Sequence, residues 1–210
     1  MSFYAVHRWS SLFVAVLSVA SLAACSASKG DWEQFPAPPP VSGQPLQERL
    51  DPLPLSFYDE SWSITAVANY AVSARVIRTE RYWTDPMAKV SPIDFALAWG
   101  PASTEEVQQS IGVTQSGRWY RFRIRGERSP LPLTLLNDNM ANTHLIPRSE
   151  DVKKLLLSIK KDEHVALQGY LVNVKGKNGL EFKTSLTRTD AGAGACEILY
   201  VVKATRIPAP

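Results

Sequence analysis

The sequence predicts a mainly β protein, a small β-barrel of five to six strands with one or two short helices. Three observations predict it. Several segments alternate apolar and polar residues with a period of two, which is typical of half-buried strands. Helical spacing with a start signal occurs in only two short segments. Seven of the 15 prolines lie between Pro36 and Pro54, ahead of these patterns, so we expect an extended linker before the folded domain.

Composition and charge exclude several classes of protein. The chain has 210 residues, 45% of them hydrophobic and 20% charged, which is enough apolar surface for a folded core and excludes a wholly disordered chain. Its two cysteines are too few for a disulfide scaffold. A net charge of +3 is too small to indicate a nucleic-acid-binding protein by itself.

The N-terminus has the pattern of an export signal. Arg8 precedes an uncharged, apolar stretch over residues 11–24, which is shorter than the roughly 20 residues of a membrane-spanning helix. Leu22-Ala23-Ala24-Cys25 resembles the lipobox of bacterial lipoproteins. The resemblance implies cleavage before Cys25 and covalent attachment of diacylglycerol and an N-acyl chain to it, which anchors the protein stably in a membrane. The alternative is an ordinary secretory signal in which Cys25 has no such role.

The residue after the cysteine bears on location. It is Ser26 and not an aspartate, and by resemblance to enterobacterial sorting rules this favours an outer-membrane lipoprotein with a periplasmic domain over the inner membrane. We therefore expect three parts: a signal peptide over 1–24, the acylated cysteine with a Pro-rich linker over 25–56, and a single domain over 57–210. No metal and no cofactor other than the attached lipid is expected.

The expected strands follow in chain order. Alternation predicts a strand over about 65–79, a short apolar run over 95–99 that stops at Gly100-Pro101, and a strand over 120–125. A stretch apolar on both faces over 165–174 and a return over 180–186, joined by a turn, predict a hairpin. A last strand is expected over 197–203.

Two helices have start signals. Ser103-x-x-Glu106 has the pattern of a capping box and predicts a helix over 104–111. Ser149 is placed to cap a second helix, whose expected apolar stripe consists of Val152, Leu155, Leu156 and Ile159.

This order of three strands, a helix and two strands is similar to the OB-fold, a small Greek-key barrel. Residues 162–171 also look like the start of the fourth strand of OB domains, with Gly169 at a tight bend. The resemblance covers about residues 65–190 and predicts an OB-like barrel. A different small β-barrel or an α+β sandwich is the alternative. The domain also resembles uncharacterised proteobacterial lipoproteins, a resemblance that names no activity.

Five arginines within 11 residues form the first candidate site. Period two places Trp119, Arg121, Arg123 and Arg125 on one face of the strand, and Arg118 and Arg128 flank it. Such a face could bind an anionic glycan, a lipid headgroup or a protein by charge and stacking, whereas nucleic acid is not expected in the periplasm. The alternative is a solvated face whose arginines pair with nearby acids.

The second candidate is the segment over 81–94. Tyr82, Trp83 and Asp85 lie in the expected connection beside the ligand-binding face of an OB-like barrel and are candidate ligand contacts. The alternative is a long loop that Trp83 fixes by packing on the core.

The remaining candidates are catalytic. His144 could act as a general base oriented by Asp138 or Asn142, or this polar segment could be a turn. Cys196 could be a nucleophile served by His144 or His164, or a small buried apolar residue. No spacing typical of a zinc site, nucleotide loop or nucleophile elbow is present.

The sequence thus favours a non-catalytic envelope lipoprotein that presents a small β-barrel to a protein, glycan or lipid partner, for instance as an accessory subunit of an envelope-spanning assembly. The alternative is a periplasmic hydrolase with a His144/Cys196 or His144/Asp138 centre. Distances discriminate between the two, because the enzyme hypothesis fails if His144 lies far from Cys196 and from every carboxylate.

Overall fold

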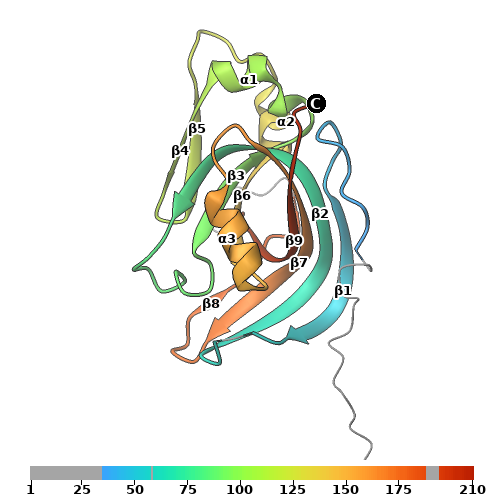
Figure 1. The fold of residues 1–210 in the computed structure, drawn as a ribbon. Coiled ribbons are helices and arrows are strands. Elements are labelled where there is room, and N and C mark those ends of the chain that lie inside the picture. The colour runs from blue at the N-terminus through green and yellow to red at the C-terminus, as the bar shows by residue number, and fades with distance from the viewer. Residues whose placement is uncertain (1–34, 58, 188–193) are drawn as a thin grey trace, which may run out of the picture.

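A computed structural model describes residues 35–57, 59–187 and 194–210 and is mainly β, as predicted (Figure 1). Its strands are β1 (Leu46–Leu55), β2 (Trp62–Arg81), β3 (Ile93–Ala98), β4 (Ile111–Ser116), β5 (Trp119–Ile124), β6 (Met140–Pro147), β7 (His164–Gly176), β8 (Glu181–Phe182) and β9 (Glu197–Ile207). Its helices are the 3₁₀ turn η2 (Gly100–Ser103), α1 (Glu105–Ser110), α2 (Leu133–Asp138) and α3 (Glu150–Ser158).

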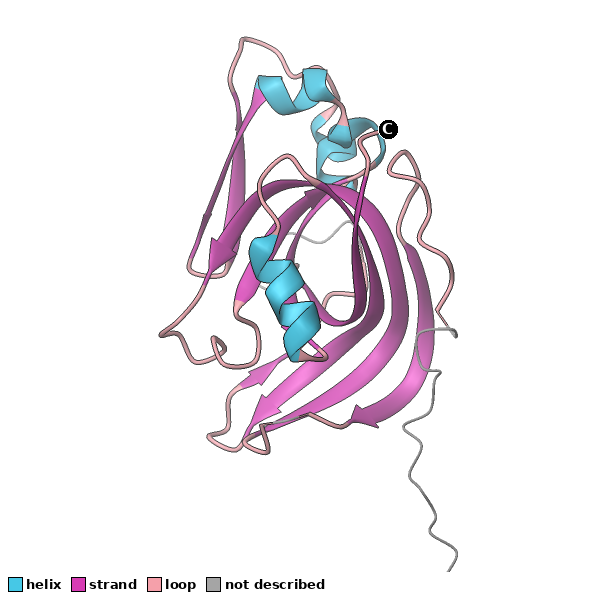
Figure 2. Ribbon diagram, in the orientation of Figure 1, coloured by secondary structure: helices cyan, strands magenta, loops and turns pink. Residues whose placement is uncertain are grey.

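The main sheet closes on itself. Its seven strands run in the order β1-β2-β3-β6-β9-β7-β8, and β2 pairs with β7 as well, so that β2, β3, β6, β9 and β7 form a ring. The 20-residue strand β2 allows this closure, because residues 62–75 pair with β7 and residues 75–81 pair with β3. All pairs are antiparallel except β6 with β9. The curved strands wrap around a common centre (Figure 2).

Apolar side chains fill the inside of the ring, where Tyr70, Phe95 and Trp99 are fully buried. Helix α3 lies against this core (Figure 1). The predicted cap and stripe of this helix are confirmed. The Ser149 hydroxyl accepts the backbone N–H of Val152 at 3.3 Å. The four predicted stripe residues pack on the core: Val152, Leu155, Leu156 and Ile159.

The arginine-rich segment lies outside the ring. The prediction that residues 120–125 form a barrel strand is wrong in its placement, because β5 pairs only with β4 in a separate two-stranded sheet. The inward face of this sheet packs on a second apolar cluster that includes Ile77, Val107 and Leu136. The third strand of the ring is β6, which the sequence pattern left as a polar segment. Every residue of β6 is buried, and among its polar side chains Asn142 bonds to Gln115 while His144 contacts Asp94.

Two local expectations fail. The capping box at α1 is wrong: Thr104 is the N-cap without a side-chain bond, and the Ser103 hydroxyl donates to the carbonyl of Gly100 at 2.8 Å. The Pro-rich segment was expected to hold no β ladder, yet its second half forms β1, which pairs with β2. Phe35 is also buried, with its ring 4.8 Å from that of Tyr170, while Trp32 lies outside the described residues.

Gly169 occupies a position where only glycine fits. The register of β7 against β9 shifts between Gln168 and Gly169, and a Cβ on Gly169 would lie 1.9 Å from the carbonyl oxygen of Tyr200. Real Cβ atoms do not approach backbone this closely, so this glycine allows β7 and β9 to pass at the bend. The expected tight bend at this glycine is confirmed.

Candidate functional site

A buried polar cluster forms where β3, β6 and β9 lie side by side. The antiparallel register of β3 and β6 places Asp94 opposite His144. The parallel register of β6 and β9 places Glu197 beside Thr143, which brings Cys196 to the same region. The tip of the β4–β5 hairpin reaches this point from outside the ring and supplies Arg118. Four separate parts of the chain therefore build the cluster.

The hairpin tip holds Arg118 in an unusual backbone conformation. Gly117 and Arg118 both have positive φ angles, 59° and 71°, which is the backbone of a two-residue type I′ turn. A non-glycine residue costs about 1 kcal/mol in this region. The side chain consequently leaves the alternation of β5 and turns toward Asp94.

Two carboxylates neutralise the guanidinium of Arg118. Nη1 lies 2.9 Å from Asp94, and Nη2 lies 2.9 and 3.0 Å from the two oxygens of Asp85. The same guanidinium donates to the hydroxyl of Ser91 at 3.1 Å and to its carbonyl at 2.8 Å. It also stacks 3.7 Å from the centre of the Tyr82 ring. This set of partners fixes the arginine in one position.

Asp94 connects this arginine to His144. Its side chain is fully buried, with one oxygen on Arg118 and the other 2.9 Å from Nδ1 of His144 and 3.5 Å from the Asn142 amide nitrogen. The ring N–H of His144 is not aligned with that oxygen, so the short distance is an ion-pair contact without a well-directed hydrogen bond. Asp94 thus lies between a guanidinium and an imidazole, both of which can carry a positive charge.

Cys196 lies at the other end of the cluster. It is a half-buried free cysteine that lies close enough to His144 to affect the pKa of that ring. Its sulfur also lies 3.8 Å from the amide nitrogen of Asn142 and 3.9 Å from the carbonyl oxygen of Arg118. Gln115 donates to Asn142 at 2.6 Å and so orients the amide toward the sulfur.

The cluster changes the titration of its histidine. Burial lowers the pKa of His144, but the neighbouring Asp94 and Cys196 side chains outweigh burial and raise the pKa to about 9. The imidazole is therefore protonated at neutral pH and carries a positive charge beside the sulfur. Burial also raises the pKa of the Tyr82 hydroxyl, which keeps it neutral as it accepts the backbone N–H of Arg118 at 3.1 Å.

A thiol, an imidazole and a carboxylate in this order can perform nucleophilic chemistry. An adjacent imidazolium stabilises the thiolate, which is the reactive form of cysteine. The carboxylate holds the ring in position and stabilises its positive charge. The amide of Asn142 adds a hydrogen-bond donor beside the sulfur.

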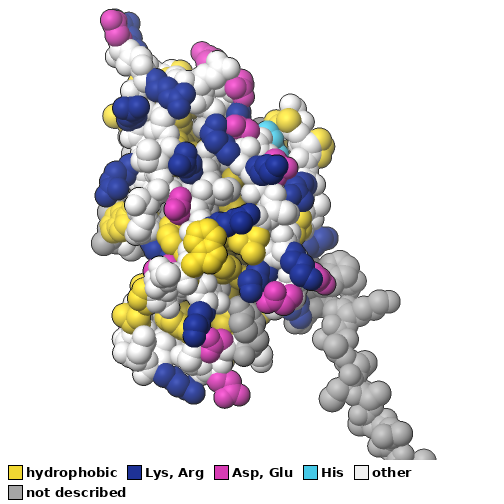
Figure 3. All heavy atoms as spheres, turned by 60° about the vertical axis from the view of Figure 1, so that its left-hand side comes forward, with side chains coloured by type: hydrophobic (Ala, Val, Ile, Leu, Met, Phe, Trp, Pro, Cys, Tyr) yellow, Lys and Arg dark blue, Asp and Glu magenta, His cyan; other side chains and the backbone are white. Residues whose placement is uncertain are grey.

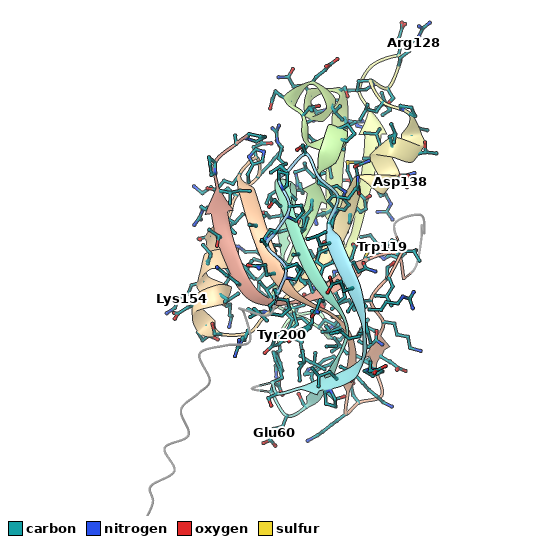
Figure 4. The ribbon with its side chains drawn as sticks, turned by 90° about the vertical axis from the view of Figure 1, so that its right-hand side faces the viewer. Glu60, Trp119, Arg128, Asp138, Lys154 and Tyr200 are labelled. Atoms are coloured by element: carbon teal, nitrogen blue, oxygen red, sulfur yellow. The ribbon has the colours of Figure 1, made fainter. Side chains whose placement is uncertain are left out.

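The predicted arginine face is split. Trp119, Arg121, Arg123 and Arg125 lie exposed on the outer face of β5, while the residues between them face the apolar cluster, so the predicted alternation is confirmed. Among the described residues, none of these three arginines forms an ion pair. Arg128 lies at the tip of a protruding loop (Figure 4). Arg118, which the sequence grouped with them, belongs to the buried cluster.

The other predicted site residues are also divided. Tyr82 and Asp85 contact Arg118, whereas Trp83 is 77% exposed, so the alternative in which Trp83 fixes the loop by packing on the core is wrong. The predicted carboxylate partner of His144, Asp138, ends α2, and the carboxylate actually in contact is Asp94. Sequence reasoning did not single out Asp94, which it placed at the end of the connecting segment over 81–94 and not in a strand beside His144. Asp94 can be recognised as the partner of His144 only when β3 is paired with β6, because that pairing places the two residues opposite each other.

Comparisons with protein-family models, with curated proteins and with solved structures found no match. In the described ranges, no group of three or more His, Cys, Asp or Glu side chains is placed to hold a metal ion. None of the helices in the described part of the chain has the length and hydropathy to cross a membrane. The sequence would also allow Arg188 to pair with Asp190, but both residues lie outside the described part of the chain.

Proposed function

We propose that this protein is a cell-envelope lipoprotein whose β domain carries a cysteine-dependent acyl-transfer site, with hydrolysis of an acyl substrate as its reaction. Cys196 is the nucleophile, His144 the general acid and base, and Asp94 the residue that positions His144. The observation that carries the proposal is the continuous contact from Asp94 through His144 to Cys196.

The proposed reaction has two steps. The Cys196 thiolate attacks the carbonyl carbon of an ester, thioester or amide and forms a carbon–sulfur bond. The bond to the leaving group breaks as His144 gives that group its proton. In the second step the neutral imidazole takes a proton from water, and the resulting hydroxide attacks the thioester. The carbon–sulfur bond breaks, the acid leaves, and the sulfur departs as a thiolate while His144 keeps the proton from water, which restores the ion pair.

Two measurements on Cys196 test this proposal in the full chain. We expect iodoacetamide to alkylate Cys196 at pH 7 about tenfold faster than it alkylates the thiol of glutathione, because an ordinary thiol is only a few per cent ionised at that pH. Mass spectrometry of the peptide that contains Cys196 separates it from Cys25. We also expect a burst of one equivalent of nitrophenol from p-nitrophenyl acetate.

Matched variants make the test specific. His144→Gln is expected to slow both reactions. Release of nitrophenol from the ester should fall at least about a hundredfold, the usual effect of losing an acid–base group. The control is His164→Gln, which removes the other histidine of the domain and leaves the cluster intact. Alkylation of Cys196 no faster than glutathione, or equal rates in His144→Gln and the parent, would refute the proposal.

The order of elements supports the finer part of the fold prediction, an OB-like barrel. The third strand is β6 and not the expected residues 120–125. The elements then follow in the order of three strands, a helix and two strands: β2, β3, β6, α3, β7 and β9. The closed pairing of β2 with both β3 and β7 is what a small barrel requires. We propose that the ring is such a barrel, with the β4–β5 hairpin inserted between its second and third strands.

The envelope location rests on the lipobox at Leu22–Cys25, which lies outside the described residues. We propose an outer-membrane anchor with the domain in the periplasm. Labelled palmitate should enter the parent chain and Cys196→Ala but not Cys25→Ala, because only Cys25 follows the lipobox. Persistence of the label in Cys25→Ala would show that the anchor is elsewhere or absent.

A second candidate function is binding of an anionic glycan, lipid or protein partner. The observation that favours it is the outer face of β5, where three exposed arginines have no acidic partner among the described residues. Crosslinking in intact cells followed by pull-down tests it. A partner complex that disappears when Arg121, Arg123 and Arg125 are replaced by alanine supports it. A complex that persists unchanged argues against this face.

A further inference from the structure

A cavity of about 270 Å3 lies between helix α3 and the loop that follows β2. Its lining is aromatic, cationic and aliphatic, and consists of Arg81, Tyr82, Trp83, Ala88, Lys89, Pro92, Lys153 and Leu157. Neither the arginine face of β5 nor the thiol of Cys196 contributes to it. It therefore calls for a separate explanation.

Three cations from three segments surround this cavity. Arg81 ends β2, Lys89 lies in the following loop, and Lys153 comes from α3. Among the described residues, no acidic side chain lines the cavity. Lys153 forms an ion pair with Glu150 at 3.2 Å, and that glutamate is exposed, so solvent weakens the pairing. The cavity thus concentrates positive charge without a matching carboxylate inside it.

The cavity also has a preorganised arginine and an exposed aromatic ring. The Arg81 guanidinium donates from Nη2 to the carbonyl of Leu157, near the end of α3, which fixes its orientation while its other N–H groups stay available. Trp83 is 77% exposed, more than any other large apolar side chain of the described residues. Apolar groups lie directly beside basic groups on this side of the molecule (Figure 3).

We propose that this cavity binds a phosphoryl group, with Arg81, Lys89 and Lys153 around its oxygens and Trp83 against the organic part of the ligand. Three cations that converge from separate segments suit a group with several charged terminal oxygens, whereas one carboxylate would need only one of them. Tryptophan beside lysine and arginine is typical of sites that meet a glycerophosphate headgroup. The proposal does not depend on chemistry at Cys196.

Binding of two soluble probes to the full chain in a non-ionic detergent tests the proposal and distinguishes its sources. Inorganic phosphate represents a free phosphoryl ligand, and dihexanoyl phosphatidylglycerol represents a lipid headgroup. The control lipid is dihexanoyl phosphatidylcholine, whose trimethylammonium group a cationic cavity repels. Isothermal titration calorimetry gives the dissociation constants, and the change in tryptophan emission on binding should disappear in Trp83→Phe.

The variants Lys89→Ala and Lys153→Ala should each weaken binding about tenfold, the usual effect of losing one charge-assisted contact. Lys154→Ala is the matched control, since Lys154 is the next residue of α3, is 77% exposed and does not line the cavity. Binding of both probes shows recognition of the phosphoryl group itself, and binding of phosphatidylglycerol alone shows recognition of a lipid headgroup. Binding of neither probe, or equal effects of Lys153→Ala and Lys154→Ala, overturns the proposal.

Discussion

Arg118 and Arg121 lie three residues apart on the same hairpin, but their side chains differ in burial and in partners. Arg118 is 15% exposed at its side chain and holds two carboxylates, a serine and an aromatic ring. Arg121 lies exposed on the outer face of β5 and, within the part of the chain that the structure describes, has no ion pair. The sequence presents both as members of one basic stretch.

The turn conformation causes this difference. Within β5 the period of two decides which side chains face solvent, and Arg121, Arg123 and Arg125 follow it. Arg118 precedes the strand in a left-handed turn, so its side chain is not bound by that alternation. Removal of a partner from a buried charge is costly, whereas exposed charges contribute little to stability. The following four variants or conditions test this contrast, from the largest expected effect to the smallest.

Replacement of Asp94 by alanine should have the largest effect. The variant Asp94→Ala leaves Arg118 and His144 without the carboxylate that joins them, and loss of one member of a buried ion pair costs about 3–5 kcal/mol. Urea denaturation of the two proteins at pH 7 measures the difference in free energy of unfolding. Asp85→Ala, at a more exposed carboxylate, should cost clearly less. Equal losses in the two variants would show that Asp94 holds no special position.

Stability should also depend on pH through His144. The pKa of this histidine rises from its ordinary 6.5 to about 9 in the folded protein. Its contribution is therefore complete below about pH 6.5 and is lost as the pH rises through about 9, which corresponds to roughly 3 kcal/mol. The difference between the denaturation curves of the parent and His144→Gln should shrink over that range. A difference that grows with pH would mean that His144 is neutral in the fold.

The conservative variant Arg118→Lys separates charge from geometry. Lysine keeps the charge but loses the two-pronged contact with Asp85 and the stack on Tyr82, so we expect a loss of about 2 kcal/mol. Arg121→Lys is the matched control and should leave the unfolding free energy unchanged. Thermal unfolding of both variants checks the prediction. An Arg118→Lys variant that is as stable as the parent would contradict the contacts assigned to Arg118.

Single alanine variants of Arg121, Arg123 and Arg125 should have the smallest effect. Each should change the free energy of unfolding by less than about 0.5 kcal/mol, because exposed side chains without partners add little stability. The same denaturation assay measures it. A loss above 1 kcal/mol at any of the three positions would place that arginine in a structural contact and reduce the contrast with Arg118.

Local patterns predicted the parts of the fold that local forces determine. The alternation of β5, the Ser149 cap and the apolar stripe of α3 depend on neighbours within a few residues, and all three are confirmed. Strand β6 escaped prediction for a physical reason. Its Asn142 and His144 are buried polar side chains, and their partners, Gln115 and Asp94, come from distant segments.

The candidate site was predictable only in part. His144 and Cys196 stood out as chemical residue types, and the idea that one serves the other remained among the alternatives. Asp94 and Gln115 had no sequence signal, and Asn142 was considered only as a residue that orients His144, because their contacts depend on the pairing of β3 with β6 and on the place of the β4–β5 hairpin. The structure supplies these pairings, and with them the carboxylate that the enzyme hypothesis required.

The parallel pairing of β6 with β9 also determines at what stage of folding the Cys196 thiol comes next to the His144 imidazole. Cys196 precedes β9, which follows β3 and β6 in the chain, so the cysteine meets His144 only after β9 has docked beside β6. A contact between segments this distant in sequence forms late in folding. The surroundings of the Cys196 sulfur are therefore completed only as the ring of strands closes.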